Sequence, residues 1–180
     1  MTKQSSPVRY ILRLTLTLLL ITAVVAGLLA LVNHITADKI AAHTAQKAES
    51  AMQQVLSAET YESLTVPDGG AVTAAYRADG LGYVVRVAPS GFGGTIDMMV
   101  GIANDGTVTG VAIVSQSETA SLGANCTRED LRSQFIGKGG TLSVNKDGGE
   151  IDALTGATVT SRAVVSGVNA ALAFVREVQQ

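Results

Sequence analysis

Residues 155–161, with the sequence TGATVTS, place four hydroxyl side chains around one Gly-Ala pair, just where helical periodicity begins. A helix N-terminus carries unpaired backbone N–H groups and the positive end of the helix dipole. It therefore binds anions well, and phosphate is the usual biological anion at such sites. One hydroxyl is enough to cap a helix, so the surplus predicts a phosphate site. A redundantly capped helix is the alternative that these residues alone leave open.

Each residue of this segment has an expected part in such a site. Gly156 and Ala157 are small, so a phosphate ester can approach the backbone closely. Thr158 is expected at the helix cap, with its hydroxyl directed at the anion. Thr160 and Ser161 are expected in the first turn, where their hydroxyls can donate to the remaining phosphate oxygens.

The residues of most other catalytic sites are scarce. A single cysteine, Cys126, excludes an internal disulfide framework and any site with several cysteine ligands. His34 and His43 both lie in the first quarter of the chain, so a zinc site or a Ser-His-Asp triad in the main domain lacks its usual parts. We therefore predict no metal ligand, and expect the chemistry to come from hydroxyls, carboxylates or a cofactor.

Residues 14–32 form an uncharged apolar run of nineteen residues near the N-terminus. As a helix the run spans roughly 28 Å, about one hydrocarbon core. Lys3, Arg9 and Arg13 precede it, and Asp38 is the first acidic residue. The positive-inside tendency predicts a cytoplasmic N-terminus and a C-terminal bulk on the other side of the cell inner membrane. The alternative, a cleaved signal peptide, normally has a shorter apolar region and a small-x-small cleavage site.

The charge of the exported part argues against two kinds of partner. Three of the thirteen basic residues precede the apolar run, so ten basic and fifteen acidic residues follow it, a formal balance of −5. An acidic domain is repelled by anionic lipid headgroups. The sequence also has no cluster of basic residues of the kind that binds nucleic acid. We expect no nucleic-acid partner.

The pattern divides the chain into four parts. Residues 1–13 are expected to be a cytoplasmic N-terminus and residues 14–32 a transmembrane helix. Residues 33–66 are Ala-rich with helical spacing and predict a stalk and linker, which ends near a turn cluster at 66–70. Residues 67–180 are expected to be one exported domain.

The exported domain is predicted to be α+β, with an antiparallel sheet and flanking helices. Strand-like stretches lie at 71–78, 82–89, 94–103, 107–117 and 141–146. Asp105-Gly106 predicts a hairpin turn. Alternation predicts one covered face of the sheet, with one of Met98 and Met99 in the core and the other outside.

Two helices are predicted in this domain. In the first, at 127–137, Thr127 is expected as the N-cap. Its apolar stripe is Leu131, Phe135 and Ile136. The second runs from Val159 to the end, with apolar residues at helical spacing.

The TGATVTS segment resembles the [ST]-G-A-[ST]-x-[ST]-[ST] signature of FMN-binding domains that carry the flavin as a phosphoester on a threonine. This family includes the G subunit of the Rnf-type ion-translocating electron transport complex and the C subunit of the sodium-pumping NADH:quinone reductase. The resemblance implies that Thr158 is the acceptor. It also places Asp152 at the acidic position where the motif recognised by the flavin transferase begins.

Two further stretches resemble the same family. Residues 91–102, GFGGTIDMMVGI, are similar to its Gly-aromatic-Gly-Gly stretch leading into a strand. Residues 114–126, VSQSETASLGANC, are similar to its Glu-Thr-Pro-Gly-Leu-Gly segment, with Ala120 and Ser121 in place of Pro and Gly. The matching residues, which are candidates for contacts with the flavin ring, are Glu118, Thr119, Leu122 and Gly123. By residue type alone, the favoured interpretation of Glu118 is an ordinary loop carboxylate.

The resemblance implies a membrane-anchored flavoprotein subunit that carries covalent FMN and relays electrons within an ion-translocating complex. Such a protein is an electron carrier rather than an enzyme by itself. Its implied partners are other membrane subunits and, for maturation, a flavin transferase. The compact length favours the Rnf type. Two alternatives are a stand-alone exported flavin reductase and a non-redox module that binds a phosphorylated ligand.

Overall fold

The computed structural model describes residues 7–67 and 69–180. Lys3 and Asp68, which belong to the predicted N-terminal charges and turn cluster, lie outside the described residues. The chain forms two compact units, residues 1–45 and residues 46–180.

Helix α1, Pro7–Val55, is the first element. Its stretch Val8–Ala37 has a mean hydropathy of 2.6, and it is long and apolar enough to cross a membrane. Threonines within it donate their hydroxyls to the carbonyl four residues earlier, as Thr15 does to Ile11 (3.0 Å) and Thr17 to Arg13 (2.8 Å). These bonds satisfy the hydroxyls without a partner outside the helix.

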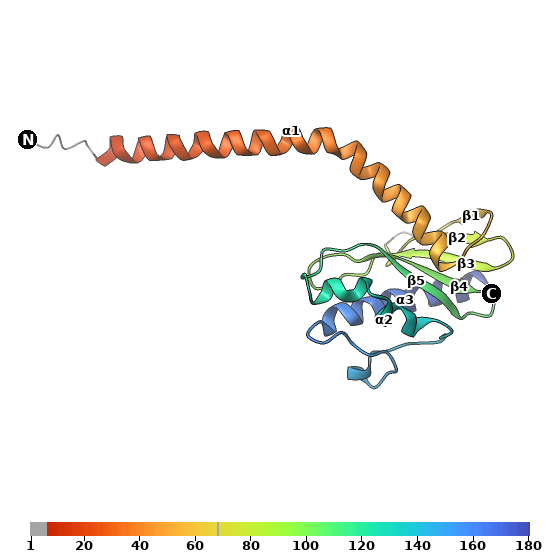
Figure 1. Ribbon diagram of the computed structural model, residues 1–180. Coiled ribbons are helices and arrows are strands. Elements are labelled where there is room, and N and C mark those ends of the chain that lie inside the picture. The colour runs from red at the N-terminus through yellow and green to blue at the C-terminus, as the bar shows by residue number, and fades with distance from the viewer. Residues whose placement is uncertain (1–6, 68) are drawn as a thin grey trace, which may run out of the picture. The chain divides into compact units, whose positions relative to one another are not determined.

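Five antiparallel strands form one sheet in chain order (Figure 1). The predicted hairpin is present between the last two strands. There Gly106 has φ +81°, and the Asp105 carboxylate accepts hydrogen bonds from the backbone N–H and hydroxyl of Thr107. The strands are β1 Tyr61–Leu64, β2 Val72–Ala78, β3 Gly82–Val87, β4 Asp97–Ala103 and β5 Val108–Ser115.

Two of the predicted strand assignments were wrong. Strand β1 lies in the stretch assigned to the linker, where YESL lacks an apolar alternation and forms only an edge strand. Residues 141–146 are not a strand, because only Val144 pairs, in an isolated bridge to Ile151. The short 3₁₀-helix η3, Asn145–Asp147, follows at once.

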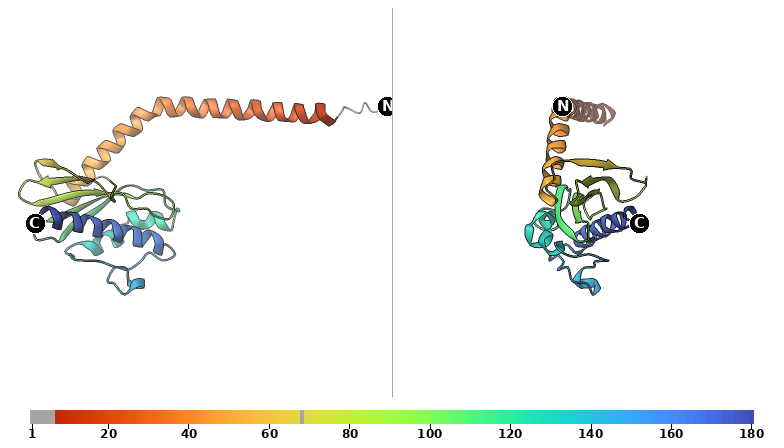
Figure 2. Two further views of the ribbon diagram at one scale, coloured as in Figure 1. Left: turned by 180° about the vertical axis from the view of Figure 1, so that it is seen from behind. Right: turned by 90° about the vertical axis from the view of Figure 1, so that its right-hand side faces the viewer.

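Both faces of the sheet are covered, which corrects the prediction of one covered face. Helix α3, Thr158–Val178, packs on one face, and the end of α1 packs on the other (Figure 2). Met98 therefore joins the α3 side and Met99 the α1 side, and both are buried. Although α3 is apolar enough to span a membrane by composition, most of it is buried in this domain.

Two paired glycines let the end of α1 approach the sheet closely. Gly101 in β4 lies opposite Gly110 in β5. A Cβ on Gly101 would lie 2.5 Å from the carbonyl oxygen of Val55, and one on Gly110 would lie 3.1 Å from the Val55 Cα. The Thr109 hydroxyl donates to that same carbonyl at 2.6 Å. The last carbonyl of the helix is thus satisfied by the sheet on which it packs.

The segment between β5 and α3 consists of short helices rather than one long helix. Thr127 does not cap a helix, because its hydroxyl donates backwards to the Ala124 carbonyl and the cap position is Arg128. Ile136, predicted to be buried, is 56% exposed. Leu131 and Phe135 are buried as predicted. The helices are η1 Gly123–Thr127, α2 Glu129–Arg132 and η2 Ser133–Phe135.

Candidate functional site

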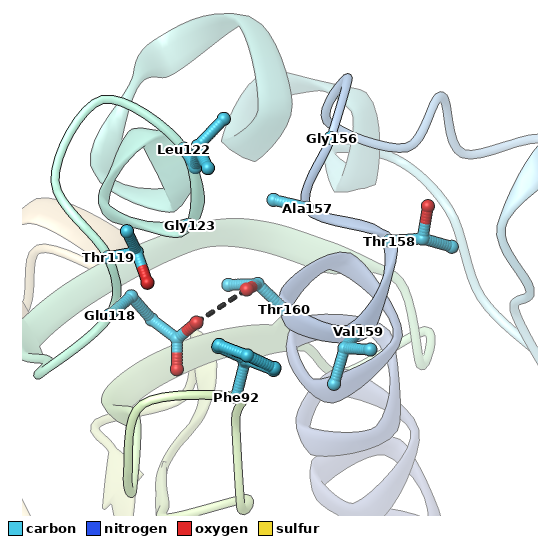
Figure 3. Close-up of a pocket in the computed structure, with 10 residues that line it drawn as sticks. All are labelled: Phe92, Glu118, Thr119, Leu122, Gly123, Gly156, Ala157, Thr158, Val159 and Thr160. Carbon is cyan, nitrogen blue, oxygen red and sulfur yellow. Dashed lines mark hydrogen bonds between the residues drawn. The ribbon is translucent and has the colours of Figure 1, made fainter.

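A pocket of about 410 Å³ lies where three segments meet. They are the glycine-rich turn before β4, the loop after β5 and the first turn of α3 (Figure 3). Apart from Thr155 and Ser161, every predicted site residue lines this pocket. The lining residues are Phe92, Glu118, Thr119, Leu122, Gly123, Gly156, Ala157, Thr158, Val159 and Thr160.

Glu118 joins the three segments. Its side chain is buried, and the residue is 8% exposed. Its Oε1 accepts a hydrogen bond from the backbone N–H of Gly93 at 2.9 Å. Its Oε2 accepts one from the hydroxyl of Thr160 at 2.5 Å, as the dashed line in Figure 3 shows. The prediction of an ordinary loop carboxylate therefore does not describe this residue.

Two glycines make room for this carboxylate. A Cβ on Gly91 would lie 2.2 Å from Glu118 Oε1, and one on Gly123 would lie 2.5 Å from Oε2. Such distances are far below van der Waals contact. The glycine-rich stretch and the loop after β5 are thus physically linked, although they are about 25 residues apart along the chain.

Helix α3 begins at Thr158, one residue earlier than predicted, so Thr158 is its first helical residue rather than its cap. The cap residue is Ala157, which has no side-chain capping bond. Thr158 is half-buried and lies at the edge of the pocket residues, with its side chain pointing away from the Glu118–Thr160 pair (Figure 3). Its hydroxyl is therefore placed at the rim, beside the positive end of a helix of 21 residues.

The other hydroxyls of the segment have different surroundings. Thr160 is buried and donates to Glu118. Ser161 is buried, donates to the Ala157 carbonyl at 3.0 Å, and accepts from the Leu154 N–H at 2.9 Å. Because Thr160 and Ser161 already bond within the protein, their role as phosphate donors stays a prediction. Thr155 is exposed and lies outside the pocket lining.

The Ala120-Ser121 replacement leaves the loop with a left-handed residue. Ser121 has φ +63°, and within residues 7–67 and 69–180 it is the only non-glycine residue with positive φ. This is the position at which the resembling motif has glycine. The loop keeps a glycine-like backbone conformation without its glycine.

Two pocket residues were not predicted from the sequence. Phe92 is 71% exposed and Val159 is 50% exposed, and both lie on the same side of the Glu118–Thr160 hydrogen bond in Figure 3. Together with Leu122, 44% exposed, they give the pocket an apolar rim. An aromatic residue between glycines in residues 91–94 was the available signal, because exposed aromatic residues often mark binding sites.

The residues present fit a flavin nucleotide. The pocket volume is within the usual range for small-molecule sites, and its rim offers apolar surface for a ring system. The N-terminus of α3, without a side-chain cap, suits a phosphate. Arg162 is exposed and forms an ion pair with Asp147 at 2.6 Å.

Other chemistry has little support in this domain. Burial and then the negative charge of Glu118 raise the pKa of the Cys126 thiol to about 11, so the thiolate that reacts is scarce at neutral pH. Within the described part of the chain, no three His, Cys, Asp or Glu residues are grouped to hold a metal ion.

Comparisons with known proteins agree with this geometry. Residues 91–173 match the FMN-binding domain family, and residues 1–55 match the RnfG N-terminal region. The chain is 33% identical over 177 residues to the G subunit of the ion-translocating oxidoreductase complex of Methanosarcina acetivorans, covering 92% of this chain and 94% of the relative. It is 33% identical over 186 residues to the G subunit of the Na(+)-translocating ferredoxin:NAD(+) oxidoreductase complex of Acetobacterium woodii, covering 89% of each.

One solved structure supports the fold. The crystal structure of the C subunit of the Na(+)-translocating NADH-quinone reductase from Parabacteroides distasonis aligns with a TM-score of 0.54 and 19% identity. The alignment covers 75% of this chain and 84% of that one. The α+β prediction, an apolar N-terminal helix followed by an antiparallel sheet with helices, is thereby confirmed. By its sequence relatives, the chain belongs to the family of G subunits of ion-translocating oxidoreductase complexes and contains an FMN-binding domain.

Proposed function

We propose that the protein is a membrane-anchored flavoprotein subunit that carries FMN as a phosphoester on Thr158 and relays electrons within an ion-translocating oxidoreductase complex. The observation that carries this proposal is the position of Thr158. It is the first residue of α3 and lines a pocket with an apolar rim. The family of the chain supports the role in electron transfer, since its relatives are named as subunits of such complexes.

The helix terminus is a suitable place for the ester. A phosphodiester retains about one negative charge, which the dipole at the start of α3 stabilises by roughly 0.3–1 kcal/mol when exposed, and by up to about 2 kcal/mol when partly buried. Thr158 is half-buried, and Gly156 before it adopts φ +77°. A Cβ on Gly156 would lie 3.2 Å from Leu122 Cδ2, so a larger residue would crowd the rim.

The apolar rim is a suitable place for the ring. Phe92, Leu122 and Val159 expose apolar surface that an aromatic ring system would bury. When bound, FMN supplies the redox chemistry, and the protein supplies position and electrostatics. We assign the ring contacts to these three residues and to Thr119, which is exposed on the same loop.

We assign the membrane topology from the N-terminal helix. Residues 14–32 cross the cell inner membrane once, and residues 1–13, with Arg9 and Arg13, stay on the cytoplasmic side. Residues 33–45 form a stalk, and residues 46–180, which include the end of α1 and strand β1, lie on the extracytoplasmic side. A covalent tether suits a carrier there, because a lost flavin would not be recaptured.

A separate flavin transferase is the proposed maturation partner. Asp152 is exposed, and its Oδ1 accepts a hydrogen bond from the Asn145 side chain at 2.9 Å. The acidic residue that begins the resembling motif is therefore accessible to a second protein. The Thr158 hydroxyl, at the rim of the pocket, is the group to be esterified.

Co-expression with a flavin transferase tests the attachment site. The wild-type chain should give a fluorescent band after denaturing electrophoresis, and Thr158→Ala should give none. Ser166→Ala, which removes an exposed hydroxyl on the same helix but outside the motif and the pocket lining, is the matched control and should keep the band. A fluorescent Thr158→Ala chain would exclude Thr158 as the attachment site.

A further inference from the structure

Glu118 is a buried carboxylate without a cationic partner in the wall of the pocket. The ion pairs found among residues 7–67 and 69–180 do not include it. Its two oxygens accept one hydrogen bond each, from the neutral donors Gly93 and Thr160. Both oxygens therefore have a hydrogen-bond partner, and neither partner is charged.

The charge of Glu118 affects its surroundings. It contributes, after burial, to the raised pKa of the Cys126 thiol. Cys126 is itself completely buried, so little water lies between the two groups to screen them. A flavin ring in the same pocket would experience the same negative potential.

The two donors connect Glu118 to two different segments of the pocket lining. Gly93 follows Phe92 in the turn before β4, and Thr160 follows Val159 in the first turn of α3. Phe92 and Val159 are the exposed apolar residues that these two segments contribute to the pocket. One carboxylate thus ties together the two segments that carry them.

We propose that Glu118 is a positioning residue that fixes the turn before β4 and the first turn of α3 relative to each other in the flavin pocket and, as an uncompensated negative charge in its wall, lowers the reduction potential of the flavin. The first part follows from the two hydrogen bonds that join these segments through Glu118. The second follows because a fixed negative charge in a poorly screened site opposes the addition of electrons to a neighbouring acceptor. This inference rests on the proposed function, since it requires a flavin in this pocket.

The test is the reduction potential of the flavinylated full-length chain in mild detergent, measured by spectroelectrochemical titration. Glu118→Gln removes the charge and keeps the shape and one acceptor. We expect it to shift the equilibrium constant for reduction at least tenfold toward the reduced form, which is about 59 mV for one electron or about 30 mV for two. An unchanged or lower potential would overturn the electrostatic part.

Glu177→Gln is the matched control. It makes the same change of charge near the other end of α3, roughly 28 Å from Thr158 along the helix axis. That distance exceeds the Debye length of about 8 Å at physiological ionic strength. We expect its potential to equal that of the wild type. An equal shift in both variants would mean that net charge, rather than Glu118, sets the potential.

Thr160→Val and Thr160→Ser test the positioning role of Glu118, and they do so even if Glu118→Gln fails to fold. Thr160→Val removes the donor and keeps the charge, whereas Thr160→Ser keeps both. We expect Thr160→Val to lower the fluorescence anisotropy of the bound flavin without raising its potential, and Thr160→Ser to restore the wild-type anisotropy. Equal anisotropy in both variants would overturn the positioning part.

These outcomes are distinct from failure of the proposed function. If the wild-type chain acquires no covalent FMN from a competent transferase, then the attachment proposal fails. If FMN is attached but neither the potential nor the anisotropy responds, then only the role of Glu118 fails.

Discussion

Thr158 and Thr160 are two residues apart on α3, yet their hydroxyls have different surroundings. Thr158 is half-buried at the pocket rim, whereas Thr160 is buried and bonded to Glu118. Successive helical residues are rotated by about 100°, so two residues that are two positions apart point in nearly opposite directions. The Thr158 hydroxyl therefore faces outward, and the Thr160 hydroxyl faces the loop after β5. Of the two, the Thr158 hydroxyl is the more accessible, as the proposed attachment requires.

Ser121 gives a prediction about local strain. A φ of +63° strains the backbone of a residue that has a Cβ but does not strain glycine. Ser121→Gly should therefore raise the free energy of unfolding by up to about 1 kcal/mol. Ala120 is the neighbouring residue and does not have a positive φ. Ala120→Gly should therefore lower the free energy of unfolding slightly, because glycine has more conformational freedom in the unfolded chain. Chemical denaturation of the full chain in detergent measures both. A destabilised Ser121→Gly would show that the serine side chain makes a contact worth more than the strain.

The sheet and its two covering helices set the position of the site. Helix α3 has its N-terminus at the pocket and its apolar stripe on one face of the sheet. The end of α1 covers the other face, where Gly101 and Gly110 admit Val55. Because both faces of the sheet are covered, Met98 and Met99 are both buried. The sequence of β4 alone does not reveal that its second face is covered.

Gly101→Ala tests this close approach. The new Cβ would lie 2.5 Å from the Val55 carbonyl and 2.4 Å from the Thr109 hydroxyl, so the helix end must move away from the sheet. We expect a loss of about 1–3 kcal/mol in the free energy of unfolding. Gly70→Ala is the control, because a Cβ there meets nothing closer than 3.9 Å. Equal stability of the two variants would contradict the packing described for Val55.

Prediction from the sequence succeeded where local signals are strong. The apolar helix, four of the five strands, the Asp105-Gly106 turn and α3 follow from periodicity and turn chemistry. It failed where tertiary contacts decide. Strand β1 exists because β2 offers it an edge, and Thr127 closes a 3₁₀ turn instead of capping α2. Glu118 gave no local sign that it would be buried between the turn before β4 and the first turn of α3.

The topology proposed for the whole molecule can be tested in intact cells. A membrane-impermeant thiol reagent should label Glu177→Cys, which is exposed in the C-terminal domain, and should not label Val8→Cys on the cytoplasmic side. The native Cys126 gives no background, because it is buried and its pKa is raised to about 11. Labelling of Val8→Cys alone would reverse the proposed orientation.

The account depends on one bond, between the Thr158 oxygen and the phosphate of FMN. Cleavage after Lys146 and Arg162 releases a peptide, residues 147–162, that contains Thr155, Thr158, Thr160 and Ser161 together. Tandem mass spectrometry of this peptide from the matured chain should find the mass of FMN less one water on Thr158. An unmodified peptide, or the same mass on Thr155, Thr160 or Ser161, would contradict the account.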